Sequence, residues 1–171
     1  MANYANTIYS INGNEKDINL IAMAFDGAES IYEGLSRLDI DFESNDKFMG
    51  EIMEAKKLED GSYSIVTYTK WQRNTDLENT LYDLFEDITI YYEEEEFGCS
   101  IFRTNDSSGE IFPERFYVDL NGEGEYFNTE QETLDYLNDY YGTEFPDLES
   151  VCKYGEEHDD DYICVFEIEV E

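Results

Sequence analysis

Aspartate and glutamate are the residues of this sequence that could take part in the most kinds of chemistry. The 171 residues include 43 Asp and Glu against 10 Lys and Arg, for a formal net charge of -33. Carboxylates at this density can bind divalent cations, act as general acids or bases, or present an anionic surface to a basic partner. The densest clusters comprise Glu93, Glu94, Glu95 and Glu96, then Glu156, Glu157, Asp159, Asp160 and Asp161, and then Glu167, Glu169 and Glu171.

Metal binding and catalysis are the less favoured of these three uses. Glu156, Glu157, His158 and Asp159 to Asp161 offer oxygen ligands for Ca²⁺ or Mg²⁺, but the EF-hand pattern is absent. His158 is the only histidine, and no Ser or Cys lies at a recognisable catalytic spacing from it. No GxSxG elbow, phosphate-binding glycine loop or zinc pattern is present. We therefore expect no catalytic residues, no cofactor and no dedicated metal site, and keep a metal-dependent enzyme as a third hypothesis.

An anionic binding surface is the favoured use. Residues 104 to 171 hold 21 acids and only two bases, Arg115 and Lys153, for a net charge of -19 in 68 residues. Solubility calls for a net charge of only about 2–8 in a small domain. On a strand, Glu167, Glu169 and Glu171 would lie about 6.6–6.8 Å apart, close to the separation of neighbouring phosphates. Such a surface can imitate nucleic acid, although a solvated acidic face is the simpler interpretation of any one cluster.

The same charge argues against several partners. It repels nucleic acids and anionic membranes, and the sequence has no basic patch to neutralise phosphates. No apolar run approaches the roughly 18 residues of a membrane helix, and the N-terminus lacks signal-peptide regions. Cys99, Cys152 and Cys164 show no CxxC spacing, which indicates free thiols in a reducing compartment. These features predict a soluble cytoplasmic protein, and they leave its oligomeric state open.

The elements expected to position these residues begin with a strand over Asn6 to Ile11. Asn14 can then cap a helix whose apolar stripe contains Ile18, Ile21, Ala22 and Phe25. The run Ser62 to Trp71 is the clearest strand of the chain. Thr75 and Glu78 form a capping-box pattern before a helix that leads into a strand at Ile88, followed by the four glutamates. Leu77, Leu81, Leu84 and Phe85 face one way on that helix.

Two parts of this first half are ambiguous. Between Ala28 and Leu58 the pattern allows a short strand at Leu38 to Phe42 and a helix at Asp46 to Ala55. Trp71 ends the clearest strand beside Lys70 and Arg73, where a tryptophan can be a partner contact. We favour the interpretation that Trp71 packs in the core between sheet and helix.

The second half is predicted to be folded as well. Strands are expected at Cys99 to Arg103 and Ile111 to Leu120, with turns at Asn105 to Gly109 and Asn121 to Gly124. Thr129 and Glu132 repeat the capping-box spacing before a helix with Leu134, Leu137 and Tyr141 on one side, and Gly142 can end it. The tail from Tyr162 to Val170 alternates apolar and acidic residues, as a half-buried strand does.

Together these elements predict an α+β protein. Residues 1–104 have the order strand, helix, strand, strand, helix, strand, which is the ferredoxin-like βαββαβ topology with two helices on one face of an antiparallel sheet. Residues 105–171 form a folded, β-rich acidic C-terminal extension, which we expect to pack on the core as one globular unit.

Three residue groups resemble a known family. They are Met1-Ala2-Asn3 running into Asn6-Thr7-Ile8, the strand ending in Thr69-Lys70-Trp71, and the strand followed by glutamates and Phe97-Gly98. Together they are similar to the YubB-like ferredoxin-like family of small proteins carried by phages, plasmids and other mobile elements. The resemblance covers roughly residues 1 to 104 and implies a fold and a genomic setting, with no catalytic residues.

Two functional hypotheses follow. The leading one is a non-enzymatic inhibitor from a phage or mobile element, which occupies the basic nucleic-acid-binding groove of a bacterial host protein as a nucleic-acid mimic. A CRISPR effector or a restriction-type enzyme would be such a partner. The alternative is an acidic adaptor that binds a protein partner through an aromatic face, with its charge serving solubility.

Overall fold

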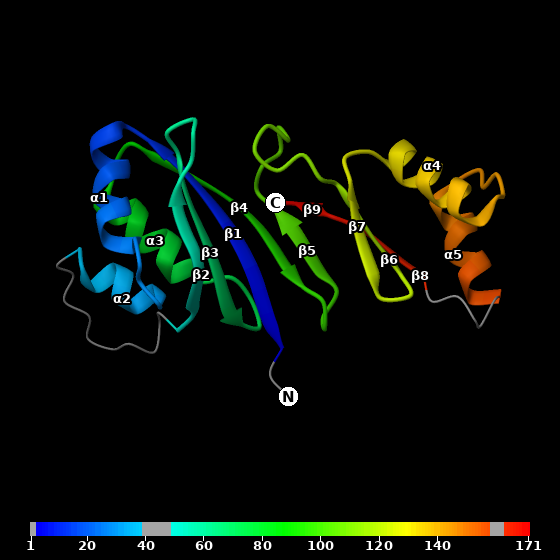
Figure 1. Cartoon of the computed structure of the whole chain (residues 1–171), viewed down its shortest axis with the longest axis horizontal. Coiled ribbons are helices and arrows are strands. Elements are labelled where there is room, and N and C mark those ends of the chain that lie inside the picture. The colour runs from blue at the N-terminus through cyan, green and yellow to red at the C-terminus, as the bar shows by residue number, and fades with distance from the viewer. Residues whose placement is uncertain (1–2, 39–48, 158–162) are drawn as a thin grey trace. The chain divides into compact units, whose positions relative to one another are not determined.

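The computed structural model describes residues 3–38, 49–157 and 163–171, and the chain divides into two compact units. Unit 1 is Met1–Asp106 and unit 2 is Ser107–Glu171, so the division lies two residues after the predicted boundary. Both units combine helices with antiparallel strands, and the protein is of the α+β class (Figure 1). Each unit has its own buried apolar cluster.

Unit 1 begins with strand β1 (Tyr4–Gly13) and helix α1 (Glu15–Phe25). The predicted cap is confirmed, because the side chain of Asn14 accepts a hydrogen bond of 3.0 Å from the backbone N–H of Asp17. Of the predicted apolar stripe, Ile18, Ile21 and Phe25 are buried. The helix ends at Asp26, which is followed by Gly27 with φ 66°.

The segment after α1 differs from the expectation. A short helix, α2 (Ile31–Ser36), is capped by Ser30, and strand β2 (Glu51–Lys57) follows. The helix predicted at Asp46 to Ala55 is therefore wrong from Met49 onward, where the described residues begin again, because pairing with the neighbouring strand decides the conformation of this weakly patterned stretch. The strand predicted at Leu38 to Phe42 lies outside the described residues, except for Leu38, which lies in a turn.

Strand β3 (Tyr63–Lys70) confirms the clearest strand prediction, and helix α3 (Thr75–Leu84) and strand β4 (Ile88–Glu96) follow it. The predicted cap of α3 is wrong by one residue. Asn74 is the N-cap, and its side chain accepts a 2.9 Å hydrogen bond from the N–H of Leu77. Leu77, Leu81 and Phe85 are buried as predicted, whereas Leu84 is exposed.

The five strands of unit 1 lie side by side in the order β2-β3-β1-β4-β5, where β5 is Ile101–Thr104. All four neighbouring pairs are antiparallel. Helices α1, α2 and α3 lie on the same side of this sheet (Figure 1). Their apolar residues form one buried cluster with inward residues of the strands, including Tyr9, Ile11 and Tyr63.

Unit 2 contains a three-stranded antiparallel sheet in the order β7-β6-β8. Its strands are β6 (Phe116–Leu120), β7 (Glu123–Phe127) and β8 (Ile163–Glu167), and its helices are α4 (Glu130–Tyr141) and α5 (Leu148–Glu157). Thr129 caps α4 and Gly142 ends it with φ 62°, as predicted. Strand β7 and helix α5 were not predicted. Val118, Leu120, Leu137 and Val151 lie in the core between the sheet and the helices.

The C-terminal tail is not the single regular strand that its alternation predicts. Strand β8 ends at Glu167, and a separate strand of two residues, β9 (Glu169–Val170), follows after Ile168. Ile168 is buried, and its backbone N–H donates a hydrogen bond of 2.8 Å to the carbonyl of Arg115. This interruption means that the regular spacing expected for Glu167, Glu169 and Glu171 does not hold along one strand.

Candidate functional site

The four consecutive glutamates of β4 do not all face solvent. Because side chains alternate along a strand, Glu94 and Glu96 follow Tyr92 on the face that α1 and α3 cover. Their exposed fractions are 0% and 1%, and that of Glu93 is 8%. Glu95 is half-buried. Buried carboxylates cannot contact a partner directly, so Glu93, Glu94 and Glu96 do not belong to the acidic surface described below.

Glu94 is instead the centre of a buried ionic network. Its Oε2 accepts a hydrogen bond of 2.7 Å from Nε of Arg103 and lies 3.5 Å from Nη1 of Arg73. Its Oε1 accepts a 2.7 Å hydrogen bond from the backbone N–H of Arg73. Arg103 lies directly opposite Glu94 on the neighbouring strand. The carboxylate thus joins β4 to β5 and to the loop that precedes α3.

Arg73 extends this network to α3 and to the Tyr92 ring of β4. Its Nε lies 3.1 Å from Oε1 of Glu78, and its guanidinium lies 4.0 Å from the centre of the Tyr92 ring. Burial raises the pKa of Glu78, and the positive charge of Arg73 opposes that rise. Burial also raises the pKa of the Tyr9 phenol, with a further contribution from the Glu78 carboxylate. Each charge in this network has an oppositely charged neighbour, which makes it a structural cluster that holds α3 against the sheet.

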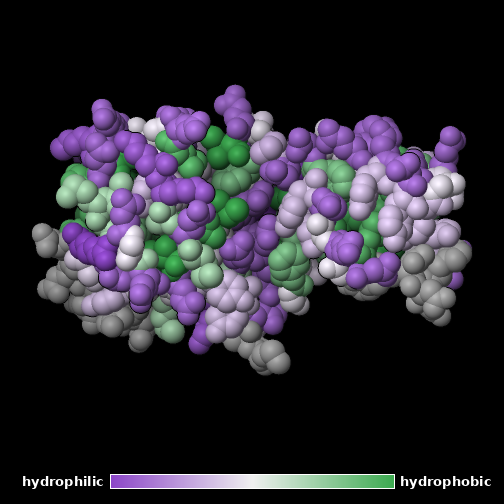
Figure 2. Space-filling model, in the orientation of Figure 1, coloured by the Kyte–Doolittle hydropathy of each residue, from purple (hydrophilic) through white to green (hydrophobic). Residues whose placement is uncertain are grey.

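Among the described residues, exposed carboxylates are more numerous in unit 2 than in unit 1, and those of unit 2 are called its acidic surface. They come from both helices, from β7, from the tail and from the loops before β6 and between α4 and α5, and hydrophilic residues cover much of the visible surface (Figure 2). These residues are Glu110, Glu123, Glu125, Glu130, Glu132, Asp135, Asp139, Glu144, Asp147, Glu149, Glu156, Glu157, Glu167, Glu169 and Glu171.

The two bases of unit 2 barely offset this surface. Lys153 is exposed and its Nζ lies 2.6 Å from the Glu149 carboxylate one turn earlier on α5. Arg115 is half-buried, and its guanidinium donates hydrogen bonds to the backbone carbonyls of Phe112 and Glu114 at 2.6 and 2.7 Å. The described surface of unit 2 therefore carries a strong negative field, to which Glu156 and Glu157 of the predicted clusters contribute.

The remaining predicted cluster falls partly outside the described residues. Asp159, Asp160 and Asp161 lie in the range 158–162, and so does His158. Within the described ranges, no group of three or more His, Cys, Asp or Glu is arranged to hold a metal ion. In the same ranges, no helix is long and apolar enough to cross a membrane. Cys99, Cys152 and Cys164 are free thiols.

Trp71 corrects the sequence interpretation. It was expected to pack in the core, yet 54% of its surface is exposed, because it follows the last residue of β3 in a left-handed conformation with φ 72°. Its N–H donates a 3.0 Å hydrogen bond to the carbonyl of Asn3, which holds the turn. A bulky residue with positive φ is strained, and such strain often accompanies function.

A pair of tyrosines that the sequence analysis did not single out lies near Trp71. Tyr4 of β1 and Tyr68 of β3 stack with their ring centres 4.7 Å apart and their planes at 6°. Both are 40% exposed. Alternation in two adjacent strands could have placed them on the same face, but their register becomes known only once the strands pair.

Comparison of the chain with protein families, with curated proteins and with solved structures finds no match.

Proposed function

We propose that this protein is a non-enzymatic inhibitor that occupies the basic nucleic-acid-binding groove of a host protein. The partner would be a CRISPR effector or a restriction-type enzyme in the cytoplasm of a bacterial host. The observation that carries the proposal is the acidic surface of unit 2, which consists of the exposed carboxylates named above. Lys153 is the single exposed base of the described part of that unit, and Glu149 already compensates its charge.

The spacing of carboxylates on α4 supports imitation of a phosphate backbone. Glu132, Asp135 and Asp139 are three and then four residues apart, so they lie along one side of the helix. At a rise of about 1.5 Å per residue, their positions along the axis differ by about 4.5 and 6 Å. Folded helices hold these charges in place, which lowers the entropic cost of presenting them to a groove.

The arrangement of unit 1 supports a ferredoxin-like core, which we propose for residues 1–104. The order β1, α1, β2, β3, α3, β4 matches the βαββαβ pattern once α2 is treated as an addition. The sheet order β2-β3-β1-β4 and the placement of α1 and α3 on one face are also those of this topology. The resemblance of the sequence to mobile-element proteins rests on the same part of the chain.

A second candidate function is favoured by the exposed aromatic residues of unit 1. Tyr4, Tyr68 and Trp71 are exposed at one end of the sheet, and aromatic side chains of this kind contribute strongly to protein interfaces. In this alternative the protein is an adaptor whose aromatic face carries the interaction and whose charge serves solubility.

Competition with DNA tests the leading proposal. The purified chain would be added to CRISPR effectors and restriction enzymes bound to fluorescent duplex DNA, and displacement would be measured by anisotropy. Displacement should occur with at least one enzyme and weaken steeply between about 50 and 200 mM salt. Inhibition whose strength does not change with salt would exclude mimicry.

A matched pair of variants separates the two candidate functions. The triple variant Glu130→Gln, Asp135→Asn, Asp139→Asn removes three charges from α4. The control Glu59→Gln, Asp83→Asn, Glu86→Gln removes three exposed charges from unit 1. Mimicry predicts that the first variant displaces DNA at least about ten-fold less well than the second, because several contacts in a groove act together. The adaptor hypothesis predicts equal, small effects.

A further inference from the structure

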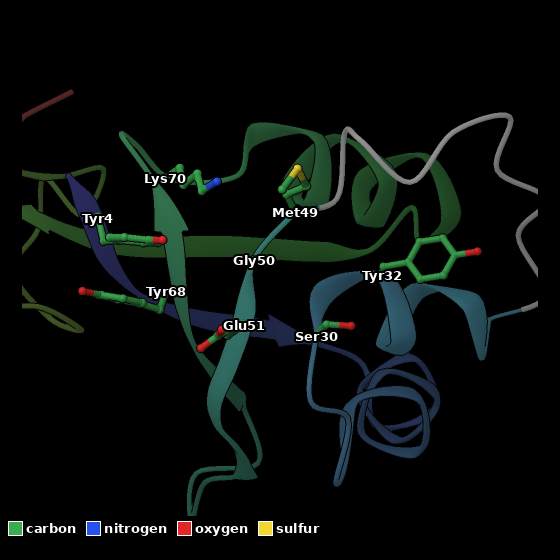
Figure 3. Close-up of a pocket in the computed structure, with 8 residues that line it drawn as sticks. All are labelled: Tyr4, Ser30, Tyr32, Met49, Gly50, Glu51, Tyr68 and Lys70. Atoms are coloured by element: carbon green, nitrogen blue, oxygen red, sulfur yellow. The ribbon is translucent and has the colours of Figure 1, made fainter. Parts of the chain in front are cut away.

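The stacked tyrosines line a hollow of about 330 Å³ at one end of unit 1. Gly50 and Glu51, where β2 begins, line it together with Met49, Ser30 and Tyr32. Figure 3 shows the two rings lying parallel, with Tyr4 coming from β1 and Tyr68 from β3. Tyr4 and Tyr68 project from the sheet face away from the helices, because they alternate with Ala5 and Thr67, which are buried on the covered face, and the hollow extends from them past the start of β2 to Ser30 and Tyr32 of α2.

Two opposite charges flank the tyrosine pair. Glu51 lies directly across from Tyr68 in the β2–β3 pairing, and Lys70 lies directly across from Tyr4 in the β1–β3 pairing. In Figure 3, Glu51 is accordingly seen on the Tyr68 side and Lys70 on the Tyr4 side. Both side chains are exposed, and neither makes an ion pair with another described residue.

These features give the site an asymmetric charge distribution, negative on the Tyr68 side and positive on the Tyr4 side. One face of the Tyr68 ring is covered by Tyr4, so a ligand can stack only on the other face. An aromatic face attracts cations, and the Glu51 carboxylate adds an acceptor for N–H donors. Lys70 repels a cation from the Tyr4 side. The Tyr68 side of the hollow therefore favours a positively charged group.

We infer that this hollow binds an arginine side chain of the protein's basic partner, with the guanidinium stacked on Tyr68 and hydrogen-bonded to Glu51. Arginine suits the site better than lysine, because its planar guanidinium stacks on aromatic rings and donates in a fork to carboxylates. The chain already contains such a contact, since the Arg73 guanidinium lies 4.0 Å from the centre of the Tyr92 ring. The net charge of -33 draws cationic partners toward it.

This inference rests on the proposed function, because the arginine is taken to come from the basic partner. It adds a specific contact on unit 1 to the diffuse attraction of unit 2. The stacked pair is held by the β1–β3 pairing before binding, so little side-chain freedom is lost when the guanidinium docks.

Trp71 provides a local probe, because it is the only tryptophan of the chain and directly follows Lys70. Its fluorescence would be followed while the whole protein is titrated with capped peptides of three Arg-Gly repeats, three Lys-Gly repeats or three Glu-Gly repeats. We expect a saturable change with the arginine peptide, a weaker affinity for the lysine peptide and no response to the glutamate peptide. Equal affinities for the first two peptides would overturn the assignment to arginine.

Variants at the site test its asymmetric charge distribution. Tyr68→Leu and Glu51→Gln should each lower the affinity for the arginine peptide by about two- to five-fold, and Lys70→Gln should raise it. Tyr140→Leu and Glu59→Gln, at exposed positions elsewhere, are the matched controls and should change nothing. Opposite signs, with Glu51→Gln raising and Lys70→Gln lowering the affinity for the arginine peptide, would overturn the proposal. Because these two positions are exposed, their variants remain informative even if Tyr68→Leu perturbs folding.

The same variants distinguish failure of this inference from failure of the proposed function. If Glu51→Gln and Tyr68→Leu displace DNA as well as the unchanged protein while the α4 variant fails, the arginine site is wrong and mimicry stands. If the α4 variant retains full activity and the two site variants lose it, the arginine site stands and mimicry is wrong.

Discussion

Glu94 shows how little the identity of a residue says about its exposure. It lies within a run of four glutamates, yet it is wholly buried between Arg73 and Arg103. Removing its charge would take away a carboxylate that lies 2.7 Å from Nε of Arg103 and 3.5 Å from Nη1 of Arg73. Replacing an ion pair by an apolar group and breaking it on one side are different changes, and the second is the costly one.

Glu94→Gln is therefore expected to lower the free energy of unfolding by about 3 kcal/mol. Urea unfolding followed by circular dichroism measures this loss. Glu86→Gln, which removes an exposed carboxylate between α3 and β4, is the control and should change stability by less than about 0.5 kcal/mol. A loss no larger than that of the control would mean that the network does not stabilise the fold.

Glu78 makes a separate prediction about pH. Its pKa in the folded protein is raised, chiefly by burial, so the folded state binds its proton more tightly than the unfolded state does. Protonated Glu78 therefore contributes stability that is fully present below the ordinary glutamate pKa. This contribution is lost as the pH rises through the raised pKa of the folded protein. The unfolding free energy of the protein minus that of Glu78→Gln should fall with rising pH across this window. A difference that rises or stays constant would contradict the assigned direction.

At the scale of elements, the start of α3 positions both Arg73 and Glu78. The sequence pattern Thr75-x-x-Glu78 suggested a capping box, but Asn74 accepts the hydrogen bond from Leu77 and Glu78 pairs with Arg73. The capping-box pattern was misleading because a tertiary ion pair competes for the glutamate.

Alanine substitutions discriminate between the two caps. Asn74→Ala should lower the free energy of unfolding by about 1 kcal/mol, because an N–H of the first turn loses its acceptor. Thr75→Ala, one residue later, should change it by less than about 0.5 kcal/mol. Chemical denaturation of both variants checks this order, and the reverse order would restore Thr75 as the cap.

At the scale of the whole molecule, charge opposes folding. The acids outnumber the bases by 33, and the repulsion among exposed carboxylates favours the expanded chain. Salt screens this repulsion over a Debye length of about 8 Å at physiological ionic strength. The same screening weakens attraction to a basic partner, so stability and binding should respond to salt in opposite directions.

The thermal midpoint should therefore rise by several degrees between about 10 and 500 mM sodium chloride, as measured by circular dichroism. The combined α4 variant, with three fewer charges, should show a smaller rise than the unchanged protein. A midpoint that is independent of salt would mean that the network of unit 1 and local ion pairs already balance the surface charge.

Local signals in the sequence predicted many of the elements correctly. Asn14 and Thr129 cap their helices, Gly142 ends α4, and β3 occupies its β-branched and aromatic run. Each of these depends on neighbours within a few residues along the chain. The segment around Ala28 to Leu58 lacks such a signal, and β2 forms there because β3 offers it a partner strand.

The sequence by itself determined the total charge, the α+β class and most of the caps, because these depend on composition and on local backbone chemistry. Tertiary structure alone decided which carboxylates are exposed. Strand alternation and register bury Glu94, whereas the carboxylates on the helices of unit 2 remain exposed. It also exposed Trp71 and stacked Tyr4 on Tyr68, because strand pairing joins residues that are 64 positions apart along the chain.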